Sequence, residues 1–248
     1  MTKKEITPQA RKMLKWFWLS FAGFLLAVVL LFIAISFGWI GYLPPISELQ
    51  NPRNRYASEI YSSDMKLLGS FSLSSGNRMS EIYQNLSPNL INALVATEDS
   101  RFYDHSGIDG WALARSLVLR GIFQIKSAGG ASTLTQQLAK QLYSPHAPNF
   151  ITRLLQKPNE WVIAVKLERL YTKEEIINMY LNQFDFLNNA VGIRTAAQVY
   201  FSTTPDKLTI EQAATLIGMC KNPAYYNPLR FNERTRGRRN TVFQQMEK

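Results

Sequence analysis

The sequence is poor in cysteine. Its single cysteine, Cys220, excludes a disulfide within the chain, and because it follows the apolar residues 216–219 we interpret it as an unreactive core residue. Internal repeats and low-complexity segments are also missing, which excludes repeat arrays and compositionally biased tracts. The sequence spells out no set of metal ligands, so we predict no metal site built by the chain itself.

Charge is missing from residues 16–43. The apolar run 17–40 within this stretch is long enough to cross a bilayer, which takes about 20 apolar residues. It is too long for a cleaved signal peptide, and residues 41–45 make a poor cleavage site. We therefore predict a single-pass transmembrane signal anchor at 16–43. The interfacial aromatic residues at its ends are Trp16, Trp18, Trp39 and Tyr42.

Acidic residues are in deficit, with 18 Asp and Glu against 28 Lys and Arg and a net charge of +10. The tail 1–15 holds five of the cations and one acid, which predicts a cytoplasmic N-terminus and places residues 44–248 outside. A surplus of about +6 remains on the outer part, which favours anionic partners such as lipid phosphates. We expect no nucleic acid partner there.

Residues 44–87 have the pattern of a linker with two β-like runs, 58–61 and 67–71, which predict a small hairpin. From Pro88 onward the pattern is helical, and we predict a mainly α domain over 88–248. Capping boxes of the form Thr-x-x-Gln or Thr-x-x-Glu precede apolar-periodic runs at Thr133, Thr172 and Thr209.

The apolar run 90–96, opened by Pro88, predicts a buried helix that ends in two carboxylates, Glu98 and Asp99. The negative end of the helix dipole disfavours charge there, which suits a group that takes up a proton. A solvated helix end is the other interpretation, and this stretch alone does not decide between them.

A second apolar stretch, 111–125, is interrupted by Arg115 and Arg120. Its composition fits a core helix, and it fits equally well a helix in the membrane interface with these arginines and Lys126 at anionic headgroups. After a glycine-containing break, residues 130–140 open a helix with hydroxyls and amides. That arrangement either caps the helix or binds an anion.

Taken together, these residues resemble the motifs of the peptidoglycan glycosyltransferases, which occur as monofunctional enzymes and as the N-terminal domain of class A penicillin-binding proteins. The matching stretches, in chain order, are Glu98-Asp99-x-x-Phe102-x-x-His105-x-Gly107; Gly130-x-Ser132-Thr133-x-Thr135-Gln136-Gln137; Gln156-Lys157-Pro158-Asn159-Glu160; Tyr180-Leu181-Asn182 with Gly192; and Glu211-x-Ala213 running on to Asn222-Pro223-x-x-Tyr226. Five motifs in order behind a signal anchor make the resemblance specific, and it covers residues 46–247.

The resemblance implies a lysozyme-like α domain of two lobes, a globular head and a membrane-dipping jaw at about 109–131. It also implies an enzyme of the bacterial inner (cytoplasmic) membrane. Such an enzyme polymerises lipid II into β-1,4-linked glycan strands, with inversion and release of undecaprenyl pyrophosphate. The implied partners are lipid II, the growing strand and membrane lipids, while cell-wall synthesis proteins that bind it are not specified. No cofactor is required, although Mg²⁺ or Mn²⁺ could join the pyrophosphate.

The implied reaction needs a base for a hydroxyl group and cations for a leaving pyrophosphate. Glu98 is the candidate base, and Glu160 resembles the family's second essential carboxylate. Lys140 and Lys157 are candidate pyrophosphate clamps. By resemblance, three further residues shape the site (Asp99, Phe102 and His105), and Ser132, Thr135 and Gln136 line the donor cleft. The full set predicted to contact substrate or shape its site is Asp99, Phe102, His105, Ser132, Thr135, Gln136, Gln137, Lys140, Arg153 and Lys157.

One departure from the family pattern concerns a cation. Gln156 stands where the family usually has arginine, and we predict that Arg153 substitutes for it. On a continuous helix Arg153, Lys157 and Glu160 lie at i, i+4 and i+7, on one face. The alternative is that Arg153 faces lipid headgroups.

Two other departures concern the backbone. Pro158 lies inside the motif helix, and we expect a kink or break between residues 154 and 158. Leu187 replaces a common family glycine, which leaves the conformation of its loop open.

Two rival functions remain at the level of sequence. The first is a lytic enzyme on the same lysozyme-like fold, which would cleave glycan with one acid and would need no pyrophosphate site. The second is a membrane-tethered cell-wall scaffold whose site has decayed, and only the change to Gln156 favours it.

Overall fold

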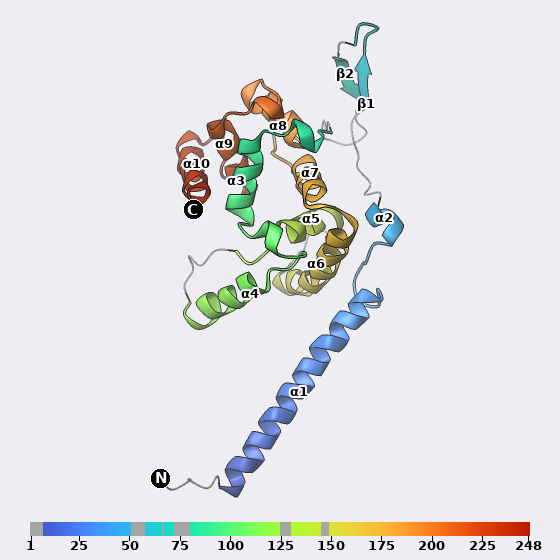
Figure 1. Ribbon diagram of the computed structural model, residues 1–248, viewed down its shortest axis with the longest axis vertical. Coiled ribbons are helices and arrows are strands. Elements are labelled where there is room, and N and C mark those ends of the chain that lie inside the picture. The colour runs from blue at the N-terminus through green and yellow to red at the C-terminus, as the bar shows by residue number, and fades with distance from the viewer. Residues whose placement is uncertain (1–6, 51–57, 66, 72–79, 125–129, 145–148) are drawn as a thin grey trace.

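The computed structural model describes residues 7–50, 58–65, 67–71, 80–124, 130–144 and 149–248 (Figure 1). It is mainly helical, with one long helix that extends away from a body of packed helices (Figure 1). The elements are α1 (Pro8–Ser36), α2 (Ile46–Gln50), β1 (Ser58–Tyr61), β2 (Leu67–Phe71), α3 (Pro88–Glu98), α4 (Gly110–Ser116), α5 (Leu134–Tyr143), α6 (Phe150–Leu170), α7 (Lys173–Gln183), α8 (Ile193–Phe201), α9 (Ile210–Cys220) and α10 (Asn232–Met246). A π-helical segment, η3 (Leu117–Ile122), continues α4.

Helix α1 is long and apolar enough to cross a membrane. It begins at Pro8, whose nitrogen needs no hydrogen bond at the first helical position. It ends at Ser36, and Gly38 and Gly41 follow with φ of +74° and +76°. The helix is therefore shifted toward the N-terminus relative to the predicted span 16–43, and the aromatic residues after Ser36 lie beyond it.

The end of α1 packs against α6. Phe32 stacks on Trp161 with ring centroids 6.0 Å apart, and Ile35 is buried. A side chain at Gly41 would collide with Asn159, because an added Cβ would lie 1.9 Å from its amide nitrogen. The last turns of the predicted anchor are therefore in contact with the helix that carries Glu160.

Helix α9 forms the centre of one half of the core, where residues 213–220 are all buried and α3 and α10 pack on them. Helices α5, α6 and α7 form the other half. Cys220 lies in this core, as predicted. Burial, and secondarily the negative charge of Glu98, raises the pKa of its thiol well above the usual value, which makes it a poor nucleophile.

Two of the predicted capping boxes form in full. Thr172 and Thr209 each accept a backbone N–H, and the residue three positions on bonds back to the cap. The third is incomplete. Thr133 accepts from the backbone of Gln136 at 3.2 Å, but the Gln136 side chain donates to the carbonyl of Gly107 at 3.1 Å instead.

The strands β1 and β2 pair antiparallel, with Ser58 opposite Phe71 and Ile60 opposite Gly69. In Figure 1 this pair projects from the body at the end opposite to α1. It contributes no residue to the buried core that the structure describes.

Large apolar side chains in the stretch after Gly110 are exposed to solvent. Trp111, Leu117 and Phe123 are 66%, 71% and 64% exposed, so the interpretation as a core helix is wrong. In Figure 1 α4 lies on the side of the body from which α1 extends. The predicted headgroup residue Lys126 lies outside the described residues.

Candidate functional site

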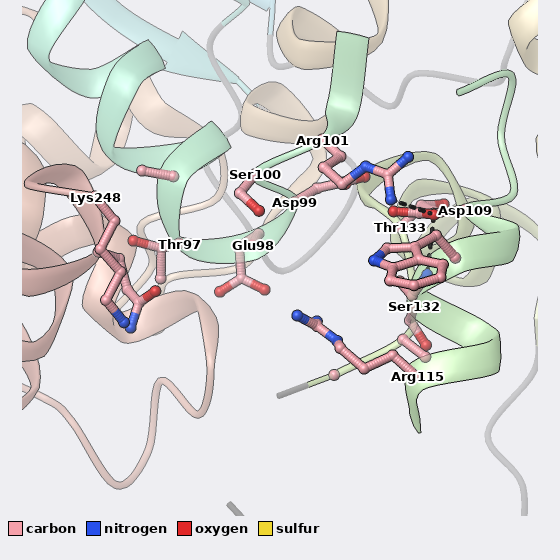
Figure 2. Close-up of a pocket in the computed structure, with 16 residues that line it drawn as sticks. Thr97, Glu98, Asp99, Ser100, Arg101, Asp109, Arg115, Ser132, Thr133 and Lys248 are labelled. Carbon is pink, nitrogen blue, oxygen red and sulfur yellow. Dashed lines mark hydrogen bonds and ion pairs between the residues drawn. The ribbon is translucent and has the colours of Figure 1, made fainter. Parts of the chain in front are cut away.

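A cavity of about 450 Å³ opens beside Glu98. Its walls come from the end of α3, the start of α4, residues 130–133 and the end of α10. Figure 2 shows Glu98 and Arg115 pointing toward each other across it. Arg115 is exposed on α4, and its predicted contact with lipid headgroups stays a prediction.

Glu98 is the last residue of α3, as predicted, and its side chain is 14% exposed. Gln137 donates its amide N–H to Oε2 at 3.0 Å. The guanidinium of Arg238 lies 3.9 Å from Oε1. Sequence reasoning missed Arg238, although the basic run on α10 between residues 234 and 239 was a signal that an acidic group faces that helix.

Asp99 ties the end of α3 to the start of α5. Its Oδ2 accepts the backbone N–H of Leu134 at 2.9 Å and lies 3.0 Å from Nε2 of His105. Phe102 is fully buried beneath this pair. These contacts hold the loop 99–105 in place, while the role of the three motif residues in shaping a substrate site stays a prediction.

Two residues predicted to line the donor cleft are buried instead. Thr135 and Gln136 are 0% and 1% exposed, and neither lines the cavity. Thr135 donates to Glu168 at 2.6 Å, whereas Gln136 holds the Gly107 carbonyl. Their polar groups are satisfied inside the protein, so neither side chain borders the cavity beside Glu98 as the prediction expected of cleft residues. Ser132 does line the cavity.

The helix that carries Glu160 does not break. α6 runs unbroken from Phe150 to Leu170 with Pro158 inside it, so of the predicted kink or break the break is wrong. Proline removes one backbone donor, and the remaining helical bonds hold the turn together with an ion pair that spans it from Arg153 to Glu160.

Glu160 is fully buried and surrounded by donors. Arg153 binds it with both terminal nitrogens, the Nη2–Oε2 distance being 3.3 Å. Lys157 Nζ lies 3.1 Å from Oε2, and Ser144 donates to Oε1 at 3.2 Å. The predicted common face of Arg153, Lys157 and Glu160 is confirmed, while Gln156 accepts a weak bond from Arg153 at 3.4 Å.

Lys140 adds a third cation to this group. Its pKa is lowered by burial first and then by the charge of Arg153, with Lys157 acting in the same direction against an opposing effect of Glu160. One carboxylate thus lies among three cations, and we call these four residues the Glu160 cluster (Lys140, Arg153, Lys157 and Glu160). A further anion would relieve its excess positive charge.

Ser132 connects the Glu160 cluster to the cavity. Lys157 donates to Ser132 Oγ at 3.1 Å, and Ser132 lines the same cavity as Glu98. The Glu98 carboxylate therefore lines the cavity, and the Glu160 cluster is one hydrogen bond away from its wall. Within the described residues, no three His, Cys, Asp or Glu side chains are arranged to hold a metal ion.

The loop with the substituted glycine keeps a glycine-like backbone. Leu187, Asn188 and Asn189 have φ of +64°, +52° and +61°, all in the left-handed region. The Leu187 N–H donates to Asp185 Oδ1 at 2.8 Å, which helps to hold the turn. Asparagine tolerates this conformation well and leucine poorly, so Leu187 carries the strain.

The sequence of this chain is similar to sequences of known proteins. Residues 64–247 match the transglycosylase family. The chain is 36% identical over 205 residues to penicillin-binding protein 1A of Escherichia coli, covering 82% of this chain and 23% of that protein. It is 35% identical over 232 residues to penicillin-binding protein 1A of Neisseria lactamica, covering 93% and 28%. It is also 35% identical over 225 residues to penicillin-binding protein 2a of Streptococcus pneumoniae, covering 91% and 28%.

The chain spans about a quarter of the length of these curated relatives. The matched region contains Glu98, the Glu160 cluster and every residue that lines the cavity beside Glu98 except Lys248. Because the family match covers most of the chain, this protein belongs to the peptidoglycan glycosyltransferase, or transglycosylase, family that includes the class A penicillin-binding proteins.

Proposed function

We propose that this chain polymerises lipid II into β-1,4-linked glycan strands, with inversion at the anomeric carbon and release of undecaprenyl pyrophosphate. The observation that carries the proposal is the pairing of a partly accessible carboxylate with a separate carboxylate buried among three cations. A lytic enzyme has no use for the cations, and a decayed site would not keep them organised around Glu160.

In the proposed reaction Glu98 takes the proton of the 4-hydroxyl of the incoming lipid II. The freed oxygen attacks the anomeric carbon of the growing strand from the face opposite the pyrophosphate. As the new C–O bond forms, the bond to pyrophosphate breaks and its electron pair leaves with the phosphate oxygen. Gln137 and Arg238 hold the Glu98 carboxylate in place for this step.

The leaving pyrophosphate is the anion that the Glu160 cluster would take. Lys140, Lys157 and Arg153 supply the charge that stabilises it as negative charge develops. Both oxygens of Glu160 are already occupied by Arg153 and Lys157. We therefore assign Glu160 the role of orienting the cations, and Arg153 the role of the missing family arginine.

We also propose how the chain is placed in the membrane. α1 would be the anchor, with residues 1–15 in the cytoplasm and the glycosyltransferase domain, residues 88–248, outside the inner membrane of a bacterium. The domain would have the two lobes of a lysozyme-like fold, with the exposed helix α4 in the jaw that touches the bilayer.

Incubation of the full chain with labelled lipid II, followed by gel electrophoresis, tests the proposed reaction. Long polymer from lipid II alone supports it. Shortening of preformed glycan would instead show the lytic enzyme, and unchanged lipid II and glycan would show the scaffold. Repeating the assay with a chelator tests whether Mg²⁺ or Mn²⁺ contributes at the pyrophosphate.

Arg153→Ala should reduce polymerisation strongly, by about 10- to 100-fold, because it removes a charge-assisted contact at the proposed pyrophosphate site. Gln156→Ala should change turnover by less than about threefold, since its contact with Arg153 is weak. The measurement is initial polymerisation rate for both variants. If only the Gln156 variant loses turnover, Arg153 is not the substitute for the family arginine.

The domain without its anchor should still bind membranes. A chain beginning after Pro44 should sediment with vesicles of anionic phospholipid, and less so at high salt. Replacing Trp111, Leu117 and Phe123 by serine should abolish sedimentation, because these side chains are exposed and apolar. Equal sedimentation of both chains would exclude α4 from membrane contact.

A further inference from the structure

We propose that Lys173 and Glu168 form a lock, a largely buried ion pair that sets the position of the loop 99–107 relative to α6. Lys173 is then a positioning residue for the proposed polymerisation, because this loop follows Glu98 directly. The inference rests on the proposed function for its catalytic consequence, and on side-chain contacts for its structural part.

Lys173 is the first residue of α7, where the positive end of the helix dipole disfavours a cation. Its side chain nevertheless turns inward. Nζ donates to Glu168 at 2.9 Å from Oε1 and 2.8 Å from Oε2, and to the carbonyl of His105 at 2.6 Å. It also lies 4.2 Å from the centre of the Phe102 ring. Lys173 thus stands at an unfavourable end of its helix and binds the His105 carbonyl, which indicates that this lysine has a role beyond forming α7.

Glu168 is the hub of the lock. Its side chain is 4% exposed, and Oε1 also accepts from Thr135 at 2.6 Å. The carboxylate therefore joins α5, α6 and α7, and Lys173 extends the connection to the loop. Buried ion pairs add little stability compared with an apolar pair of the same size. An ion pair does, however, hold its two side chains in a fixed geometry, which an apolar pair would not reproduce.

The loop has three further hydrogen bonds to α5 and its cap. Asp99 accepts from the backbone of Leu134, and the Gly107 carbonyl accepts from Thr133 at 2.7 Å and from the Gln136 side chain at 3.1 Å. Gly107 has φ of +90°, and a Cβ there would lie 2.9 Å from the backbone of Ala164. Glycine is required at this point, so the loop is pressed directly against α6.

The Glu160 cluster, the contact with the loop and the lock lie along a stripe on one face of α6. Glu160, Ala164 and Glu168 are spaced by four residues, which places them on the same face of the helix. The stripe thus carries the cation cluster, the loop contact and the lock in order. Because the loop follows Glu98 directly and rests on this stripe, its position contributes to the separation between Glu98 and Glu160, and the lock is its charged attachment.

Lys173→Met in the full chain, in detergent micelles, tests the lock. We expect kcat for lipid II polymerisation to fall by about 10- to 100-fold, the loss that a small misplacement of a catalytic group produces. KM should change by less than about threefold. Amide hydrogen exchange in residues 99–107 should become faster, because an attachment of the loop is lost.

A kcat within about threefold of the wild type would overturn the lock. A lower kcat with unchanged exchange would overturn it as well, since the loop would then not carry the effect. Arg194→Met is the matched control. It removes a pair with Glu81 at 4.0 Å and a bond to the Ser80 carbonyl at 3.4 Å, neither of which involves residues 99–107, and should leave both kcat and exchange in that loop unchanged.

If Lys173→Met does not fold, the double variant Glu168→Gln with Lys173→Met is used in its place. It removes both charges of the pair, so no uncompensated charge stays buried. The same two readouts then decide. If the wild type fails to polymerise lipid II, the proposed function is wrong. The lock is then decided by exchange alone, with faster exchange in the variant supporting it and unchanged exchange overturning it.

Discussion

Glu98→Gln should lower lipid II polymerisation by about 10²- to 10⁴-fold, the usual cost of losing a general base. The change is nearly isosteric. Gln137 can still donate to the remaining carbonyl oxygen. Arg238 is 11% exposed, but its guanidinium lies 3.9 Å from Glu98, so the change breaks no close ion pair. The fold and the binding of lipid II should therefore persist. Initial rates, lipid II binding and a thermal melt measure the three quantities.

Glu233→Gln is the matched control for this change. Glu233 is exposed in the first turn of α10 and lines no part of the cavity, so its variant should polymerise at the wild-type rate. A folded Glu98→Gln protein that keeps more than about a tenth of wild-type turnover would remove Glu98 from the role of base.

Glu160→Gln should also cripple turnover, but with a large loss of stability. Glu160 is fully buried and forms ion pairs with Arg153 and Lys157. Removing one partner of a buried ion pair costs about 3–5 kcal/mol, because the remaining charges are left uncompensated. For a chain of this size that corresponds to a fall in Tm of about 10 °C. The melt therefore separates this variant from Glu98→Gln.

A second variant separates stability from chemistry at the same position. Combining Glu160→Gln with Arg153→Met removes one cation together with the carboxylate, so Tm should recover in part while turnover stays low. Recovery of turnover along with Tm would show that Glu160 acts only through stability. An unchanged Tm for Glu160→Gln alone would contradict the buried ion pairs.

Local spacing was sufficient for part of the site. The end of α3 at Glu98 follows from an apolar run opened by Pro88, and the common face of Arg153, Lys157 and Glu160 follows from helical periodicity. Both features depend on residues within about three turns of one another. The sequence therefore determined the family, the mainly helical class and the two carboxylates.

Tertiary structure alone decided which partners these groups have. Arg238 meets Glu98 across 140 positions of sequence, and Lys173 meets the His105 carbonyl across 68. Thr135 and Gln136 turn into the protein because α5 packs its buried face on α6 and α7, which no local pattern reveals. Helix periodicity assigns side chains to faces, but only the packing of the helices determines which face borders the cavity and which is buried.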